Sequence, residues 1–118
     1  MYKYCNKNPL GRLEDDCVIR AISCATDRSW DSVYDELSDL AQLNGTMMDS
    51  KGFVLWYLDN HFERIPAPET VGELAEKADG IILCTVKNHI CCIKHHIIYD
   101  TFNPSYKKVE YAWLVKID

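Results

Sequence analysis

The spacing of apolar residues predicts helices in the first two thirds of the chain. Apolar positions recur every three to four residues in four segments, as they do along the buried face of an amphipathic helix. Residues that can cap a helix N-terminus precede three of these segments, namely the Asp15-Asp16 pair, Ser29 and Thr70. Helices are therefore expected over residues 17–26, 30–41, 50–60 and 70–78.

After Gly80 the pattern changes to short apolar runs rich in β-branched residues, which is typical of strands. The first 14 residues are polar, and Asn8-Pro9 together with Gly11 predicts an irregular entry arm there. Strands are expected over residues 81–86, 89–94, 97–101 and 109–115, with a further short strand over 62–65.

The order of these elements predicts the fold class. Helices that precede a set of antiparallel strands are typical of the α+β class. We expect a single domain over residues 1–118, with a mainly helical half over 1–79 and an antiparallel sheet half over 80–118. The helix that begins at Cys17 is expected to be central and to pack on that sheet.

Composition and charge narrow the function classes. The chain has 118 residues, of which 47% are hydrophobic and 26% charged, as in ordinary globular domains. No apolar run approaches the roughly 20 residues that span a bilayer, and the first residues lack a secretory signal, so we expect a cytoplasmic protein without membrane contact. The net charge is −5 and no basic stripe is present, which argues against nucleic-acid binding.

Six cysteines are many for a chain of this length. In the cytosol they are expected to stay reduced, and no C-x-x-C pair provides the spacing of a zinc site, so neither a disulfide framework nor a metal cofactor is predicted. His95-His96 is expected to face water at a hairpin tip. Most of the thiols should be small buried hydrophobes, which leaves the question whether one of them is a nucleophile.

Cys17 is the candidate nucleophile. It lies in the first turn of a predicted helix, where the helix dipole stabilises a thiolate. Asp15 and Asp16 directly precede it and would repel that thiolate. Taken alone, this position favours a buried cysteine at a helix start over a reactive one.

The predicted hairpin brings a histidine and an acid together. If His95-His96 is a two-residue turn, Cys91 lies opposite Asp100. Side chains alternate along a strand, so His89 shares a face with Cys91 and lies diagonally across from Asp100. We expect Asp100 near His89 Nδ1, where its carboxylate would orient the imidazole. A three-residue loop would invert the alternation and turn Asp100 away.

A helix-initial cysteine, a strand-initial histidine and an acid one hairpin later resemble the papain-like cysteine peptidase superfamily in its smallest form. More closely, the chain resembles a group of small phage and prophage proteins with that arrangement. The resembling stretches are Asn6-Lys7-Asn8-Pro9, Asp16-Cys17-Val18-Ile19-Arg20-Ala21-Ile22, Ser29-Trp30-Asp31-Ser32-Val33-Tyr34, Asn88-His89-Ile90 and Ile98-Tyr99-Asp100-Thr101-Phe102.

The resemblance implies a papain-like fold and a role for each residue. Cys17 would be the nucleophile, His89 the general base and acid, and Asp100 the orienting residue. The oxyanion hole would use the Cys17 backbone N–H and a side-chain donor upstream. Papain-like enzymes usually have Gln six residues before the cysteine. This chain has Gly11 there, so Asn8 is the nearest upstream amide and Asn6 the second.

The function expected from these residues is that of a thiol hydrolase, a cysteine peptidase that cleaves an amide or peptide bond in a protein or peptide substrate. Two alternatives stay open. One is a cell-wall amidase or endopeptidase with the same triad. The other is a non-catalytic phage-type module on the same fold that binds a host protein, which would place it in the host cytoplasm. The missing Gln fits this last alternative.

Overall fold

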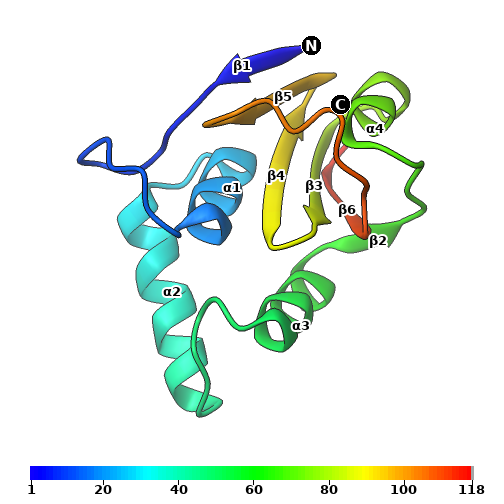
Figure 1. Ribbon diagram of the computed structural model, residues 1–118. Helices are drawn as coiled ribbons and strands as arrows, with labels where there is room; N and C mark the ends of the chain where they lie inside the picture. Colours follow the sequence, from blue (N-terminus) through cyan, green and yellow to red (C-terminus); the bar gives the residue numbers. More distant parts are fainter. Residues whose placement is uncertain (118) are drawn as a thin grey trace.

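The computed structural model describes residues 1–117 and shows four helices packed on one six-stranded sheet (Figure 1). The helices are α1 (Cys17–Thr26), α2 (Trp30–Leu43), α3 (Lys51–His61) and α4 (Val71–Lys77). The strands are β1 (Tyr2–Tyr4), β2 (Glu63–Ile65), β3 (Ile81–Val86), β4 (His89–Lys94), β5 (Ile97–Asp100) and β6 (Tyr111–Lys116). The α+β class and the predominance of helices in the N-terminal part are confirmed.

The sheet has the order β1-β5-β4-β3-β6-β2 and is mixed. All its pairs are antiparallel except β1 with β5, in which Tyr2 lies beside Ile98. The expectation of an irregular arm over the first 14 residues is therefore wrong for β1, and the sheet is not confined to residues after Gly80. Three residues are too few to show strand alternation. Their pairing depends on the free edge that β5 offers.

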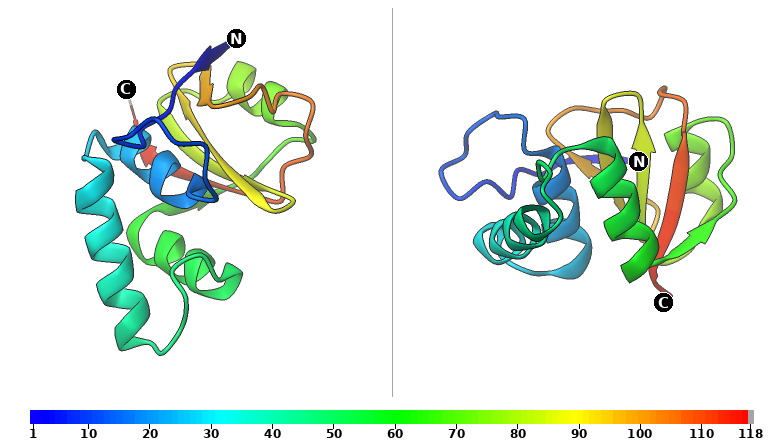
Figure 2. Two further views of the ribbon diagram at one scale, coloured as in Figure 1. Left: turned by 60° about the vertical axis from the view of Figure 1, so that its left-hand side comes forward. Right: turned by 90° about the horizontal axis from the view of Figure 1, so that it is seen from below.

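Helices cover both faces of the sheet (Figure 2). One face packs against α1, α2 and α3, and its core includes Ile90 and Cys92. The other face packs against α4, and its core includes Cys91 and Ile93. These four consecutive residues of β4 alternate between two cores because side chains of a strand point to opposite faces. The strand is thus buried on both sides, which explains its almost unbroken apolar sequence.

The β4–β5 hairpin closes with the two-residue turn expected from the sequence. His95 and His96 have φ values of 51° and 70°, the positive φ at both positions that a type I′ turn requires. The register pairs Lys94 with Ile97 and Cys92 with Tyr99, as expected. The side chain of Asp100, the last residue of β5, therefore lies on the face of the sheet that strand alternation predicts.

Gly80 lets the chain pass close to its own C-terminal strand. Its φ is +87°, and a Cβ atom at this position would overlap the carbonyl oxygen of Lys116. Only glycine fits such a contact without a shift of the backbone. Across residues 1–117, the structure contains no helix with the length and apolar character needed to cross a membrane.

Candidate functional site

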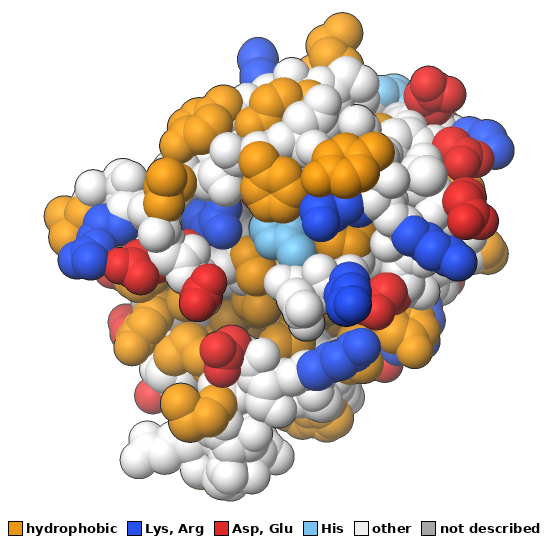
Figure 3. Space-filling view, in the orientation of Figure 1, with side chains coloured by type: hydrophobic (Ala, Val, Ile, Leu, Met, Phe, Trp, Pro, Cys, Tyr) orange, Lys and Arg blue, Asp and Glu red, His pale blue; other side chains and the backbone are white. Residues whose placement is uncertain are grey.

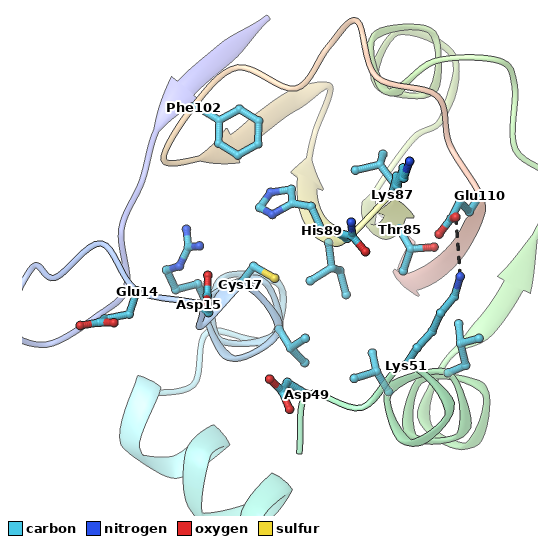
Figure 4. Close-up of a pocket in the computed structure, with 17 residues that line it drawn as sticks. Glu14, Asp15, Cys17, Asp49, Lys51, Thr85, Lys87, His89, Phe102 and Glu110 are labelled. Carbon is cyan, nitrogen blue, oxygen red and sulfur yellow. Dashed lines mark ion pairs between the residues drawn. The ribbon is translucent and has the colours of Figure 1, made fainter. Parts of the chain in front are cut away.

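A pocket of about 880 Å³ opens between the N-terminus of α1, the start of α3 and the β3–β4 turn. Cys17 and His89 both line it, and their side chains point toward the same space (Figure 4). The space-filling view shows a hollow with apolar side chains at its floor and charged side chains around its rim (Figure 3). The tertiary structure thus brings residues 17 and 89 together in a solvent-open cleft.

His89 makes a short hydrogen bond to Asp100. The distance between His89 Nε2 and Asp100 Oδ2 is 2.6 Å. The contact expected from the hairpin is therefore present, but the expectation that it involves Nδ1 is wrong. Strand register defines which face a side chain takes and does not define the rotation of the imidazole ring. Because Nε2 is used by Asp100, Nδ1 is the ring nitrogen left for proton exchange with a thiol.

Several interactions act on the charge state of His89. Burial lowers its pKa, but hydrogen bonds with Asp100, Cys17 and Cys91 and the charge of Asp100 outweigh burial and raise the pKa to about 11. The imidazole is thus held in its protonated form at neutral pH. The ring of Phe102 packs against it, with the two ring centroids 4.8 Å apart.

The Asp100 carboxylate is nearly buried, with 4% of the residue exposed. Its second oxygen, Oδ1, accepts a hydrogen bond from the Thr101 backbone N–H at 2.7 Å and lies 3.6 Å from Arg20 Nη1. A buried carboxylate needs such partners to remain charged. Together they hold Asp100 in place to orient His89.

Arg20 connects Asp100 to a second buried carboxylate, that of Asp16. Arg20 Nε donates to Asp16 Oδ1 at 2.7 Å, while Asp16 Oδ2 accepts from Asn8 Nδ2 at 3.1 Å and from Trp30 Nε1 at 2.9 Å. Burial raises the pKa of Asp16, but these hydrogen bonds outweigh it and lower the pKa below its ordinary value. Because Arg20 neutralises Asp16, this carboxylate repels a thiolate at Cys17 less than the sequence suggested.

The side chain of Asp16 does not cap α1, although Asp16 is the residue that precedes it. Both of its oxygens are held by Arg20, Asn8 and Trp30 and accept no hydrogen bond from the first turn. The N–H groups of a first helical turn have no partner within the helix. At α1 they point toward the end of the helix that carries Cys17, where an anionic oxygen would find donors.

Asn8 does not line the pocket, and its side chain is used elsewhere. Its Nδ2 donates to Asp16, and its Oδ1 accepts from the backbone N–H of Leu10 at 2.9 Å. Asn6 Nδ2 donates to the Arg12 carbonyl oxygen at 3.1 Å. The structure thus brings Cys17, His89 and Asp100 together and keeps both proposed amide donors outside. Among the described lining residues, the side-chain amide is that of Asn88.

Sequence reasoning missed Arg20, Trp30 and Phe102 as parts of this site. The i, i+4 spacing of Asp16 and Arg20 is a known ion-pair spacing on a helix and was an available signal. The contact of the Trp30 indole N–H with Asp16 depends on how α2 packs beside α1. Nothing in the sequence indicated that Phe102 would cover His89.

Acidic and basic residues lie at different places around the rim of the pocket. Asp15 and Asp49 lie on the α1 and α3 side, and Lys87 lies at the β3–β4 turn (Figure 4). Lys51 and Glu110 form an ion pair of 3.7 Å across the pocket edge. The rim of the pocket therefore carries side chains of both signs of charge.

His89, Cys91 and Asp100 form the one group of potential metal ligands within the described part of the chain, with their ligand atoms within 4.8 Å of one another. A thiolate is the form of cysteine that binds metal. A hydrogen bond with Cys84, followed by burial, raises the pKa of Cys91 well above its ordinary value, so this thiol keeps its proton. The donor chemistry therefore suits a hydrogen-bonded His–Asp pair better than a metal ion.

His96 is exposed at the hairpin tip, as expected, and it also makes two polar contacts. Its Nδ1 lies 2.8 Å from the Ala75 carbonyl oxygen, and its Nε2 lies 3.0 Å from Asp79 Oδ1. These contacts attach the hairpin to α4 at a place remote from the pocket. The expectation that this residue is exposed is confirmed, and the contact with Ala75 arises because α4 packs over the second face of the sheet beside the turn.

Comparison of the chain with models of protein families, with curated proteins and with solved structures finds no match.

Proposed function

We propose that this protein is a thiol hydrolase of papain-like type that cleaves an amide bond, in the first instance a peptide bond. The observation that carries the proposal is the 2.6 Å hydrogen bond from His89 Nε2 to Asp100 Oδ2 at a pocket that Cys17 also lines. A nucleophile, a base beside it and a third group that orients the base form the arrangement that activates cysteine for covalent catalysis.

In the proposed reaction, the Cys17 sulfur attacks the carbonyl carbon of the substrate, and the carbonyl electrons move to its oxygen. The backbone N–H groups at the start of α1 stabilise this oxyanion. As the carbonyl re-forms, the C–N bond breaks, His89 gives its proton to the leaving amine, and an acyl–cysteine intermediate remains. His89 then accepts a proton from water, which attacks the acyl carbon. The C–S bond breaks, the acid product leaves, and Cys17 is returned as the thiolate beside a protonated His89.

The roles of the surrounding residues follow from their contacts. Asp100 holds the imidazole through Nε2, and Arg20 and the Thr101 N–H hold Asp100. Phe102 covers the ring and keeps water away from the His89–Asp100 hydrogen bond. No cofactor takes part in this reaction.

One observation favours a second candidate, a binding module without catalytic activity on the same fold. The Asn8 amide is engaged by Asp16 and cannot act as an oxyanion donor without breaking that hydrogen bond. A site with fewer donors than the reaction needs would still offer a pocket for a peptide segment of a host protein.

The test is chemical and then enzymatic. At pH 6–7, iodoacetamide should alkylate Cys17 ahead of the other five thiols, and His89→Ala should slow this selective labelling. Wild-type protein should then cleave members of a fluorogenic peptide library, and Cys17→Ala should not. Cys24→Ser, a change at another thiol of α1, is the matched control and should leave labelling at position 17 intact.

The outcomes separate the candidates. Selective labelling with peptide cleavage supports the peptidase. Cleavage of purified peptidoglycan but not of the peptide library supports the cell-wall alternative. Labelling of Cys17 no faster than that of a free thiol, without turnover on either substrate, contradicts the hydrolase and favours the binding module.

A further inference from the structure

A second group of cysteines lies behind the pocket and plays no part in the proposed reaction. Cys24 of α1 borders a small cavity together with Cys5, which follows β1, and hydrogen bonding with the thiols of Cys5 and of Cys92 in β4 acts on its pKa. All three are free thiols. The N-terminal arm, α1 and the central strand thus meet at a cluster of three sulfur atoms, which we call the thiol cluster.

The surroundings of the thiol cluster favour an ionised thiol at Cys24. The hydrogen bond from Cys92 lowers the pKa of Cys24, burial opposes this change, and the charges of Lys94 and Lys7 lower the pKa further, to about 7. Lys94 Nζ also donates to the Cys24 carbonyl oxygen at 3.1 Å, which holds the ammonium group beside this residue. A thiolate is the form of cysteine that reacts with peroxides.

Cys5 is better placed than Cys92 to react with an oxidised Cys24. Cys92 is fully buried within β4, and its residue is paired with Leu83 on one side and Tyr99 on the other. Disulfide formation requires the two backbones to approach to a defined distance, and a residue held on both sides resists such a movement. Cys5 lies beyond the end of β1, is half-buried and borders a small cavity shared with Cys24.

We propose that Cys5 and Cys24 form a reversible disulfide when the protein meets hydrogen peroxide or another hydroperoxide. The Cys24 thiolate attacks one peroxide oxygen and the O–O bond breaks. A sulfenic acid forms, and the departing oxygen takes a proton from solvent and leaves as water, or as an alcohol from an organic hydroperoxide. The Cys5 thiol then attacks the sulfenic sulfur, the S–O bond breaks, and a disulfide and water form. The two sulfurs together lose two electrons, which the peroxide takes up.

The bond would enclose the segment that carries the candidate nucleophile. Residues 6–23 lie between the two cysteines, and Cys17 is among them. The backbone N–H of Cys5 donates to the Asp100 carbonyl oxygen at 2.9 Å, so the arm that the disulfide fixes also contacts the strand end that holds Asp100. Oxidation would therefore fasten the arm and α1 around the site without consuming Cys17.

Trypsin separates the relevant cysteines, which makes the test direct. Cleavage after Lys and Arg places Cys5 in peptide 4–7, Cys17 in 13–20, Cys24 in 21–28 and Cys92 in 88–94. The full chain is treated with stoichiometric hydrogen peroxide, its remaining thiols are blocked, and it is digested without reductant. Mass spectrometry should find peptides 4–7 and 21–28 joined, and dithiothreitol should separate them.

Two variants and a thermal measurement complete the test. Cys5→Ser, a change at a half-buried position, should abolish the crosslink, whereas Cys92→Ala should retain it. Oxidised wild type should melt about 10 °C above the reduced protein, and Cys5→Ser should show no such rise. The proposal is overturned if peptide 21–28 is joined to 88–94, if peptide 13–20 alone is oxidised, or if no joined peptides form. None of these measurements requires that the protein be an active hydrolase.

Discussion

The carboxylate of Asp100 lies 2.6 Å from His89 Nε2 and holds the imidazole by the nitrogen farther from the backbone. This relationship leaves the other nitrogen, Nδ1, for the proton exchange with Cys17 that we propose. It also makes the imidazole depend on a buried acid at the end of a neighbouring strand. The effects of substitutions at the site follow from this arrangement.

Substitutions at Asp100 should show whether turnover depends on the hydrogen bond that orients the His89 ring or on the negative charge of the carboxylate. In Asp100→Asn, the amide oxygen still accepts the Nε2–H, so turnover should fall far less than the about 10²–10⁴-fold expected when His89→Ala removes both proton transfers. Asp100→Ala removes the acceptor and leaves Arg20 without one of its acidic neighbours, so it should cost more than Asp100→Asn. The measurement is kcat/KM on a library-derived peptide. Equal losses in Asn and Ala variants would show that Asp100 does not orient the ring.

Cys17 and His89 should act as one unit. Neither Ala nor Ser at position 17 supplies a thiolate, so both variants should lose turnover while they keep their fold by circular dichroism. The double variant Cys17→Ala/His89→Ala should be little slower than Cys17→Ala alone, because residues of one catalytic unit are not additive. If the fold-loss of turnover in the double variant equals the product of the losses in the two single variants, Cys17 and His89 do not act in the same step.

The raised pKa of His89 predicts how stability depends on pH. A protonated His89 is favoured in the folded protein, where its pKa is about 11, over the unfolded chain, where it is about 6.5. Its contribution to the free energy of unfolding is therefore complete below about pH 6.5 and decreases as the pH rises toward 11. Urea unfolding of wild type and of His89→Gln at pH 6, 8 and 10 should show a difference that shrinks with pH. If the difference in unfolding free energy between the two proteins stays the same at all three pH values, the raised pKa of His89 is contradicted.

Asn8 should matter for stability and not for the chemical step. Asn8→Ala removes one hydrogen bond to the buried Asp16 carboxylate, which should cost about 1.5–3 kcal/mol of unfolding free energy because the acceptor is charged. The turnover number should be nearly unchanged. Loss of an oxyanion donor would instead lower kcat by about 10²–10³-fold. Asn88→Gly keeps a turn residue suited to positive φ and tests the amide that does line the pocket.

Two glycines provide a matched test of the close approach at Gly80. Both Gly45 and Gly80 have positive φ, so alanine at either position should cost about 1–2 kcal/mol for the backbone conformation. At Gly80 the new Cβ atom would also overlap the Lys116 carbonyl oxygen, whereas at Gly45 nothing lies within 4 Å. Gly80→Ala should therefore unfold at a clearly lower urea concentration than Gly45→Ala. Equal midpoints would mean that β6 shifts freely.

The sequence by itself determined most secondary structure and the hairpin geometry. Helical periodicity located α1 to α4, and alternation along two strands joined by His95-His96 placed Asp100 on the side of His89. Both inferences hold because they depend on the local period of side chains, 3.6 residues in a helix and 2 in a strand, which can be read from neighbouring residues.

Only the tertiary structure decided the contacts that join distant segments. The parallel pairing of β1 with β5, the capture of Asp16 by Asn8 and Trp30, and the placement of Arg20 beside Asp100 join segments up to 98 residues apart. The ring nitrogen of His89 that meets Asp100 was likewise settled by packing around the imidazole. Such contacts depend on how whole elements pack, and neither the periodicity nor the spacing of residues encodes that packing.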